Sequence, residues 1–243
     1  MLTLGIDFAS QPKNTAAALL NWEFGRAILV SLTVPADDNA LTALSTDADK
    51  IGIDIPLGWP ESFIDAINKH RAAEEWPASS THALRFRATD LFVHSRIKKW
   101  PLSVSSDRIG VPAFRAARLA PKLAGSKSVD RTGGGRMVEV YPKAALLRWR
   151  IELRDKEHTD LLFADLCAAT SEWLHISDQQ CEKLQSNRDA LDSLICALIA
   201  RAAALGFCES IPPESLPLAQ REGWIALPVQ DSLAKLPRDG ITK

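Results

Sequence analysis

Apolar residues in the first 55 positions fall into short runs that are separated by residues typical of turns. Runs of this kind indicate the strands of a sheet. A short glycine-containing turn, Glu23–Arg26, separates the second run from the third, so these two runs are predicted to form a hairpin. The fourth run is closed by the proline-containing segment 56–60, because proline cannot continue a central ladder. The predicted strands are Thr3–Phe8, Thr15–Trp22, Ala27–Val34 and Lys50–Ile55.

Helical spacing of apolar residues dominates the second half of the chain. It is clearest in Asn187–Leu205, and Gly206 is placed to cap the C-terminal end of this helix. Between 76 and 135 two Trp-Pro pairs interrupt any pattern, and the glycine run 133–135 indicates a flexible break. Arg136–Tyr141 is predicted as a fifth strand. The other predicted elements are the helices Asn39–Ala48, Glu61–Glu75, Ala113–Ala120, Ala144–Trp149 and Thr159–Leu174, and a closing strand or docked segment at Glu222–Pro228.

A hairpin followed by strands that alternate with helices predicts an α/β fold, with a mixed sheet and helices on both faces. The chain has 243 residues, of which 46% are hydrophobic and 24% charged, so we expect one globular domain over 1–243. Its four cysteines form no C-x-x-C pair, which argues against a zinc site or a disulfide framework. No apolar stretch is long enough to span a bilayer and no basic leader is visible, so we expect a cytoplasmic protein without a membrane partner.

The net charge of −1 conceals an uneven distribution of charged residues. Residues 61–136 contain 14 Lys and Arg against 7 Asp and Glu, whereas the remaining residues contain 15 against 23. We expect a helical, basic insertion at about 61–135 attached to an acidic frame. Such a region suits a phosphate-bearing partner such as nucleic acid, although a solvated basic surface would give the same composition.

Carboxylates at the ends of apolar elements are the main candidates for chemistry. A carboxylate in an apolar strand is costly unless it is neutralised, and two of them ~4 Å apart repel by ~4 kcal/mol at a dielectric of ~20. A converging set must therefore be protonated, paired with a base or bound to a cation. Ligands that offer only oxygen favour Mg²⁺ or Mn²⁺. The candidates are Asp7, Asp54, Glu139, Asp189 and Asp192.

Structural roles are open for the same acids. Asp7 and Asp54 could accept hydrogen bonds from turn amides at the ends of their strands. Asp189 could simply be a favourable charge at a helix N-terminus. Asp192 lies deeper in the apolar helix, on the same face as Asp189, where a structural role is harder to assign.

The segment Arg85-x-Arg87-x-x-Asp90 has two possible roles. Arginine matches phosphate oxygens in a bidentate way, so Arg85 and Arg87 could bind phosphate with Asp90 in a supporting role. The same arginines could instead hold Asp90 and Glu139 in a structural ion network.

Six short segments carry a family resemblance, and their order and spacing are more specific than any one of them. The chain resembles a bacterial and archaeal family of predicted nucleases with a ribonuclease H fold, known as a domain of unknown function. Its last long helix also resembles that of Holliday-junction resolvases, in which two aspartates three residues apart open the helix. The segments are Gly5–Asp7, Ile53–Gly58, Arg85–Asp90, Val138–Pro142, Asp189–Asp192 and Glu222–Ile225.

The resemblance implies a ribonuclease H-like mixed sheet with acids at Asp7, at Asp54, and at Asp192 or Asp189. It implies that Glu139 and Asp90 are additions particular to the family. Ribonuclease H enzymes proper carry their second acid on a helix after the hairpin, and this sequence offers no clear equivalent. That departure argues against RNA–DNA hybrids as the substrate.

The leading hypothesis is a metal-dependent nuclease that hydrolyses phosphodiesters by a two-metal carboxylate mechanism. A non-catalytic nucleic-acid-binding or scaffold protein on the same fold is the alternative. A nucleotide-dependent phosphotransferase is less favoured, because residues 8–13 contain no glycine for a phosphate loop. The predicted roles are Mg²⁺ or Mn²⁺ binding by Asp7, Asp54 and Asp192, completion of a second site by Glu139 or Asp189, and phosphate binding by Arg85 and Arg87.

Overall fold

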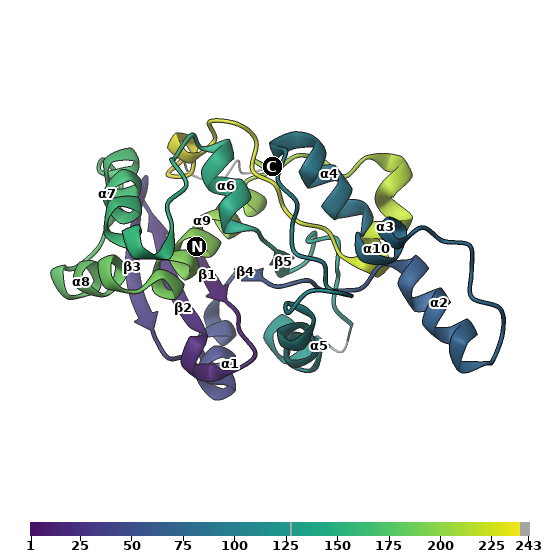
Figure 1. Ribbon diagram of the computed structural model, residues 1–243. Coiled ribbons are helices and arrows are strands. Elements are labelled where there is room, and N and C mark those ends of the chain that lie inside the picture. The colour runs from purple at the N-terminus through teal and green to yellow at the C-terminus, as the bar shows by residue number, and fades with distance from the viewer. Residues whose placement is uncertain (127, 239–243) are drawn as a thin grey trace.

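The described part of the computed structural model, residues 1–126 and 128–238, contains one mixed sheet of six strands in the order β5-β4-β1-β2-β3-β6 (Figure 1). β2 runs antiparallel to β1 and β3, whereas β4 is parallel to β1, β5 to β4 and β6 to β3. The predicted mixed sheet is thus confirmed. The strands are β1 Leu2–Asp7, β2 Ala16–Glu23, β3 Arg26–Thr33, β4 Lys50–Asp54, β5 Met137–Glu139 and β6 Leu174–His175.

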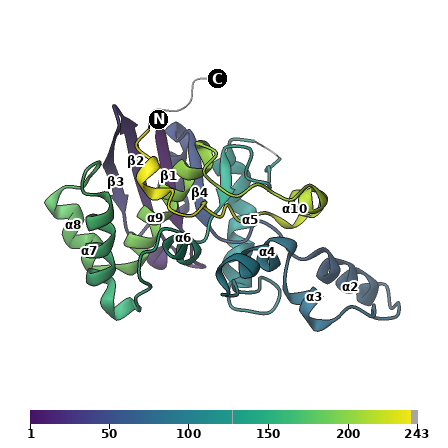
Figure 2. The same ribbon diagram turned by 90° about the horizontal axis from the view of Figure 1, so that it is seen from above.

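Ten α-helices are found in the same residues 1–126 and 128–238, and they cover both faces of the sheet. α9 lies across β1, β2 and β4 with α6, α7 and α8 on its face, and α1 and α5 cover the opposite face. α2, α3 and α4 lie to one side of the sheet, on the side away from β3 (Figures 1 and 2). The helices are α1 Asp38–Asp47, α2 Glu61–Arg71, α3 Thr81–Arg85, α4 Ala88–Ile97, α5 Gly110–Ala124, α6 Pro142–Arg148, α7 Thr159–Thr170, α8 Asp178–Ser186, α9 Arg188–Ala204 and α10 Leu216–Glu222.

Side chains in β1 and β4 alternate between two separate cores. Leu4 and Ile6 point to the core beneath α1 and α5, together with their β4 neighbours Ile51 and Ile53. The residues between them face α9. Every helix in residues 1–126 and 128–238 is too short or too polar to cross a bilayer.

Glycine at two paired positions brings α9 against the sheet. Gly5 and Gly52 are register partners on the α9 face of β1 and β4. A Cβ added to Gly5 would lie 2.1 Å from the Ser193 carbonyl oxygen, and one added to Gly52 would lie 2.5 Å from the Cys196 carbonyl oxygen. Because neither strand has a side chain at this level, the helix backbone rests directly on the strand backbones.

Several short elements were not predicted from the sequence, namely α3, α4, α8, α10 and β6. α8 buries only Leu184, so it has no apolar periodicity to detect. Its signal is the capping box formed by Ser177 and Gln180. The predicted helix Thr159–Leu174 is too long, because the chain leaves α7 after Thr170 and Leu174 pairs with β3.

The segment Glu222–Pro228, predicted as a closing strand or a docked segment, docks beside β5. Ile225 forms a parallel bridge with Glu139 of β5, and the Ala226 amide donates to the Glu139 carbonyl at 2.9 Å. Gly206 follows α9 with a φ of 73°, as predicted for its cap. The hairpin turn is also as predicted, with Phe24 and Gly25 at φ 49° and 73°.

Replacing Gly5 by Ala should destabilise the protein strongly, because the new methyl group would enter the backbone of α9. We expect a loss of about 3 kcal/mol or more, which corresponds to a fall of about 6–12 °C in the melting temperature. Gly206→Ala is the control, since nothing lies within 4 Å of its added Cβ and only its φ of +73° is unfavourable. Its expected cost is about 1 kcal/mol. Equal losses in the two variants would show that α9 does not rest on Gly5.

Candidate active site

Two aspartates end the two central parallel strands side by side. Asp7 closes β1 and Asp54 closes β4, and the two residues are register partners. Since Gly5 and Gly52 precede them by two positions, both carboxylates lie on the α9 face. Neither carboxylate forms a hydrogen bond or an ion pair with any residue in the described part of the chain. They are therefore not the turn caps that a structural role would require.

Two further aspartates reach the same region from the first turns of α9. Asp192 accepts a hydrogen bond from Arg188 Nε at 2.9 Å, and Asp189 accepts one from Lys156 Nζ at 3.0 Å. Both acids thus have a cation beside them, unlike the strand acids. The cations in these two pairs differ in exposure, because 14% of the Arg188 side chain and 76% of the Lys156 side chain are accessible to solvent.

Burial, together with repulsion between neighbouring acids, raises the pKa values of the two strand acids. Burial raises the pKa of Asp7 well above its usual range, and the charges of Asp192, Asp54 and Asp189 raise it further. Burial also raises the pKa of Asp54, with Asp192 and Glu139 adding to it. Asp7, Asp54, Asp189 and Asp192 are thus electrostatically coupled, and we refer to these four residues as the acid cluster.

Glu139 lies apart from this cluster because of the register in which β5 pairs with β4. It pairs with Ile53 rather than Asp54, so it points to the opposite face of the sheet. There both of its oxygens accept hydrogen bonds from Arg87, at 2.7 and 2.8 Å, and Oε2 accepts another from the Leu57 amide at 3.0 Å. The structural alternative for Glu139, an ion pair with an arginine, is thus what the structure contains.

Arg87 is the centre of a buried ion network. Its side chain is 1% exposed, and it also binds Asp90 through Nε and Nη2, at 3.2 and 2.9 Å. Its remaining donor, on Nη1, reaches the Glu222 carbonyl at 3.2 Å. All five N–H donors of Arg87 are therefore engaged within the described chain, which leaves this predicted phosphate ligand without a donor for phosphate.

Arg85, the other predicted phosphate ligand, is near the surface. Its Nε donates to the Ser106 hydroxyl at 3.0 Å, its guanidinium lies 5.0 Å from the ring centroid of Phe86, and 42% of the side chain is exposed. A contact between Arg85 and a phosphate stays a prediction.

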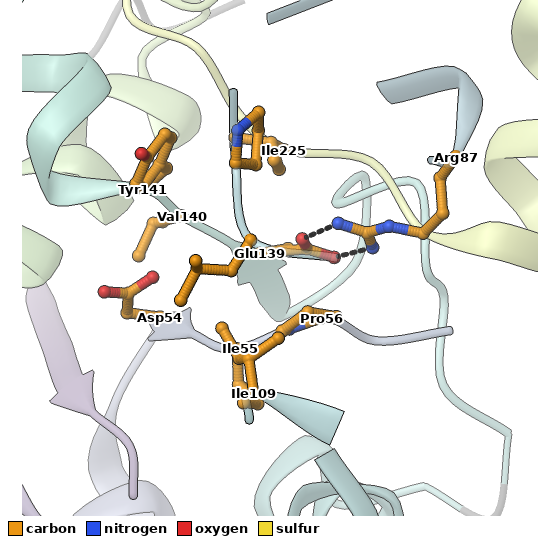
Figure 3. A pocket seen from close by; sticks show the side chains of 11 residues that line it. Asp54, Ile55, Pro56, Arg87, Ile109, Glu139, Val140, Tyr141 and Ile225 are labelled. Carbon is orange, nitrogen blue, oxygen red and sulfur yellow. Dashed lines mark hydrogen bonds and ion pairs between the residues drawn. The ribbon is translucent and has the colours of Figure 1, made fainter. Parts of the chain in front are cut away.

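A cavity of about 110 Å³ separates Asp54 from the Arg87–Glu139 pair (Figure 3). Its remaining wall is mostly apolar, and Tyr141 lies on the same side as Asp54 (Figure 3). Burial and the charge of Asp54 raise the pKa of Tyr141 to about 12. The phenol therefore keeps its proton at neutral pH and can donate a hydrogen bond.

The oxygen ligands of the cluster are those that Mg²⁺ and Mn²⁺ prefer. Asp7 and Asp54, adjacent and without partners, fit such an ion, and binding would remove the repulsion between them. Among residues 1–126 and 128–238, however, no three Asp, Glu, His or Cys side chains are grouped closely enough to hold a metal ion together. Asp192 accepts a hydrogen bond from Arg188 through Oδ1, which leaves Oδ2 without a hydrogen-bond partner among the described residues.

Sequence reasoning missed Tyr141, Lys156 and Arg188 as members of this region. Tyr141 was visible only as part of a family segment. The signal for Arg188 is its spacing of four residues from Asp192 on one helix, which places both on the same face. Lys156 lies 33 residues before Asp189, and no local pattern joins the two.

Comparison with known proteins gives the chain a family. The fold is a mixed α/β fold, and the model of the family "Protein of unknown function (DUF429)" matches residues 5–216. The chain belongs to this family. No curated protein and no solved structure matches it.

Asp7→Asn should stabilise the metal-free protein at neutral pH. The folded state raises the pKa of Asp7, so stability from the protonated group is present below the unfolded pKa of about 3.9 and is lost as the pH rises through the folded value. Asparagine removes the ionised form, and we expect a gain of about 3–6 °C in the melting temperature at pH 7.5, shrinking towards pH 4. Melting curves in the presence of a chelator measure this. Asp47→Asn, at an exposed carboxylate, should change little at either pH, and equal behaviour of the two variants would contradict repulsion at Asp7.

Arg87→Met should lower the free energy of unfolding by about 3–5 kcal/mol, because it leaves Glu139 and Asp90 buried without a counter-charge. Arg85→Ala should cost less than about 1 kcal/mol, since its ion pair with Asp107 is long and exposed. Urea denaturation midpoints compare the two. A loss for Arg87→Met as small as that for Arg85→Ala would mean that the network adds no stability.

Proposed function

We propose that this chain is a metal-dependent nuclease of ribonuclease H-like fold that hydrolyses phosphodiester bonds in nucleic acid in the cytoplasm. The observation that carries the proposal is the pair Asp7 and Asp54, two unpartnered carboxylates at adjacent strand ends whose pKa values are raised by burial and by neighbouring acids. A structural acid would be paired, as Glu139 is with Arg87. A repulsive pair at the end of a sheet suits a site that a hard cation completes.

The arrangement of strands supports the fold assignment. β1 has the antiparallel hairpin β2–β3 on one side and the parallel strands β4 and β5 on the other. The acids end β1 and β4, and a long helix carrying two aspartates three residues apart crosses the same strands. This is the order of features that the family resemblance implies.

In the proposed mechanism, Asp7 and Asp54 would hold Mg²⁺ or Mn²⁺. Asp192 would join them through the oxygen that Arg188 does not engage, and Asp189 would support a second ion. When bound, the metal would activate a water and stabilise the leaving oxygen of a phosphodiester. Tyr141, which keeps its proton, can donate a hydrogen bond to a substrate oxygen beside Asp54.

Glu139, Asp90 and Arg87 have a positioning role in this proposal. Their network joins the end of β5 to α4 and to the carbonyl of Glu222, next to the chain that docks on β5. It thereby fixes one wall of the cavity that contains Asp54. Glu139 and Asp189 were the two residues predicted to complete a second metal site. Asp189 fits this role, whereas Glu139 does not, because its side chain lies on the face of the sheet opposite α9.

Titration with Mn²⁺ and a nuclease assay test the proposal together. We expect wild-type protein to bind Mn²⁺ calorimetrically and to cleave a DNA or RNA strand, with cleavage abolished by chelator. Asp7→Asn and Asp54→Asn should each weaken binding at least about tenfold and cleavage at least about a hundredfold, because each removes one of two adjacent ligands.

The control is Asp47→Asn, which changes an equally acidic side chain at an exposed position. Its metal binding and cleavage should match wild type. If wild-type protein fails to bind Mn²⁺ at millimolar concentration, the non-catalytic binding or scaffold alternative replaces the enzyme. Cleavage that is equal in Asp7→Asn and wild type would also reject the mechanism.

A further inference from the structure

A second hollow, with basic residues on its wall, opens beside Asp192. It has a volume of about 290 Å³, near the lower end of the range of small-molecule pockets. Four of its lining residues are basic and two are acidic, so the wall carries a net charge of +2. We call it the basic cleft; its lining residues are Lys143, Leu153, Arg154, Asp155, Lys156, Arg188 and Asp192.

The cations of the basic cleft retain capacity for a ligand. Lys143 forms no hydrogen bond or ion pair with residues of the described chain. In the same residues, the Lys156 ammonium group forms a hydrogen bond and an ion pair with Asp189 alone, and 76% of the Lys156 side chain is exposed. Arg188 uses Nε for Asp192 and Nη1 for the Arg154 carbonyl, which leaves Nη2 without a partner among the described residues.

The position of the basic cleft links it to the acid cluster. Asp192 belongs to both, and the charge of Lys156 acts on Asp7 and lowers its pKa against the other influences. Lys143 lies in the first turn of α6, two residues after Tyr141, which lines the cavity containing Asp54. The short segment 141–143, at the start of α6, therefore contributes a residue to each of the two hollows.

The basic middle of the chain offers less free charge than its composition suggests. Arg87 is buried in its ion network, and Arg115 binds Asp38 and the Ala9 carbonyl. Arg136 donates to three carbonyls at the end of α1 and just after it, those of residues 45, 46 and 48. Three of the 14 Lys and Arg residues of 61–136 thus bind other parts of the protein, so the composition of this region overstates the positive charge that is free for a phosphate.

We propose that the basic cleft binds a phosphate group of the substrate through Lys143, Lys156 and Arg188, and so places the adjoining ester bond at Asp7 and Asp54. A phosphate there would give Arg188 a second anionic partner as well as Asp192. The role of the basic cleft in placing an ester bond rests on the proposed nuclease function. The binding of phosphate itself requires no metal. The phosphate could belong to a nucleic-acid backbone or to a free nucleotide, since both present the same oxygens.

Binding measured in the presence of a chelator tests the basic cleft without the metal site. The probes are a fluorescent 12-nucleotide DNA strand, the equivalent RNA strand, and inorganic phosphate and AMP as competitors. The double variant Lys143→Ala/Lys156→Ala should bind the preferred strand about tenfold more weakly than wild type and show a shallower salt dependence, by about two charges. Lys98→Ala/Lys99→Ala removes the same charge from exposed positions of the basic middle and should bind as wild type does.

Each outcome has a definite meaning for the basic cleft. Displacement of the strand by phosphate or AMP indicates a site for a terminal phosphate, and resistance to both indicates a backbone site; both support the inference. Equal strand binding by wild type and the Lys143/Lys156 variant overturns it, as does a loss confined to the Lys98/Lys99 variant. Strand binding at the basic cleft without Mn²⁺-dependent cleavage would reject the nuclease and leave the phosphate site standing.

Discussion

The contact between α9 and the two glycines of β1 and β4 determines the rest of the structure. Gly5 and Gly52 allow the helix backbone to rest on the sheet, where a single methyl group on either would overlap it. The same contact fixes the depth at which Asp192 stands beside the strand ends. A wider separation would move Asp192 away from Asp7 and Asp54 and weaken the repulsion that raises the pKa values of both strand acids.

The protein handles its buried acids differently on the two faces of the sheet. Glu139, one register position behind Asp54, is neutralised by a fully engaged arginine. Asp7 and Asp54 are left to repel each other on the α9 face. Since a carboxylate that is partly buried without a counter-charge lowers stability, the contrast between the two faces is the physical argument for a site on the α9 face rather than at Glu139.

Local patterns predicted the parts of the fold that local physics determines. The alternating strands, the hairpin and α9 follow from periodicity and turn residues, and the acids at strand ends follow from the same patterns. The face of the sheet to which the Glu139 side chain points could not be predicted from the sequence. It depends on the register of β5 against β4, and a shift of one residue would move this side chain to the face of Asp54. The sequence Gly-Ile-Asp occurs at both 5–7 and 52–54. The repeated glycine indicates that another element packs closely on these strands, but the sequence does not show that this element is α9.

Charge composition alone could not show which cations are free to bind a ligand, for a related reason. A count of arginines cannot distinguish a guanidinium that binds main-chain carbonyls from one that faces solvent, and Arg115 and Arg136 are of the first kind. The cations of the basic cleft come instead from 143–188, a stretch without a positive surplus, because α6, α9 and the loop before α7 meet beside Asp192. A phosphate held there would lie beside the acid cluster. The cations of the basic cleft would reduce the repulsion between that phosphate and the carboxylates. The repulsion that disfavours an empty acid cluster would then help to draw both cation and substrate to one end of the sheet.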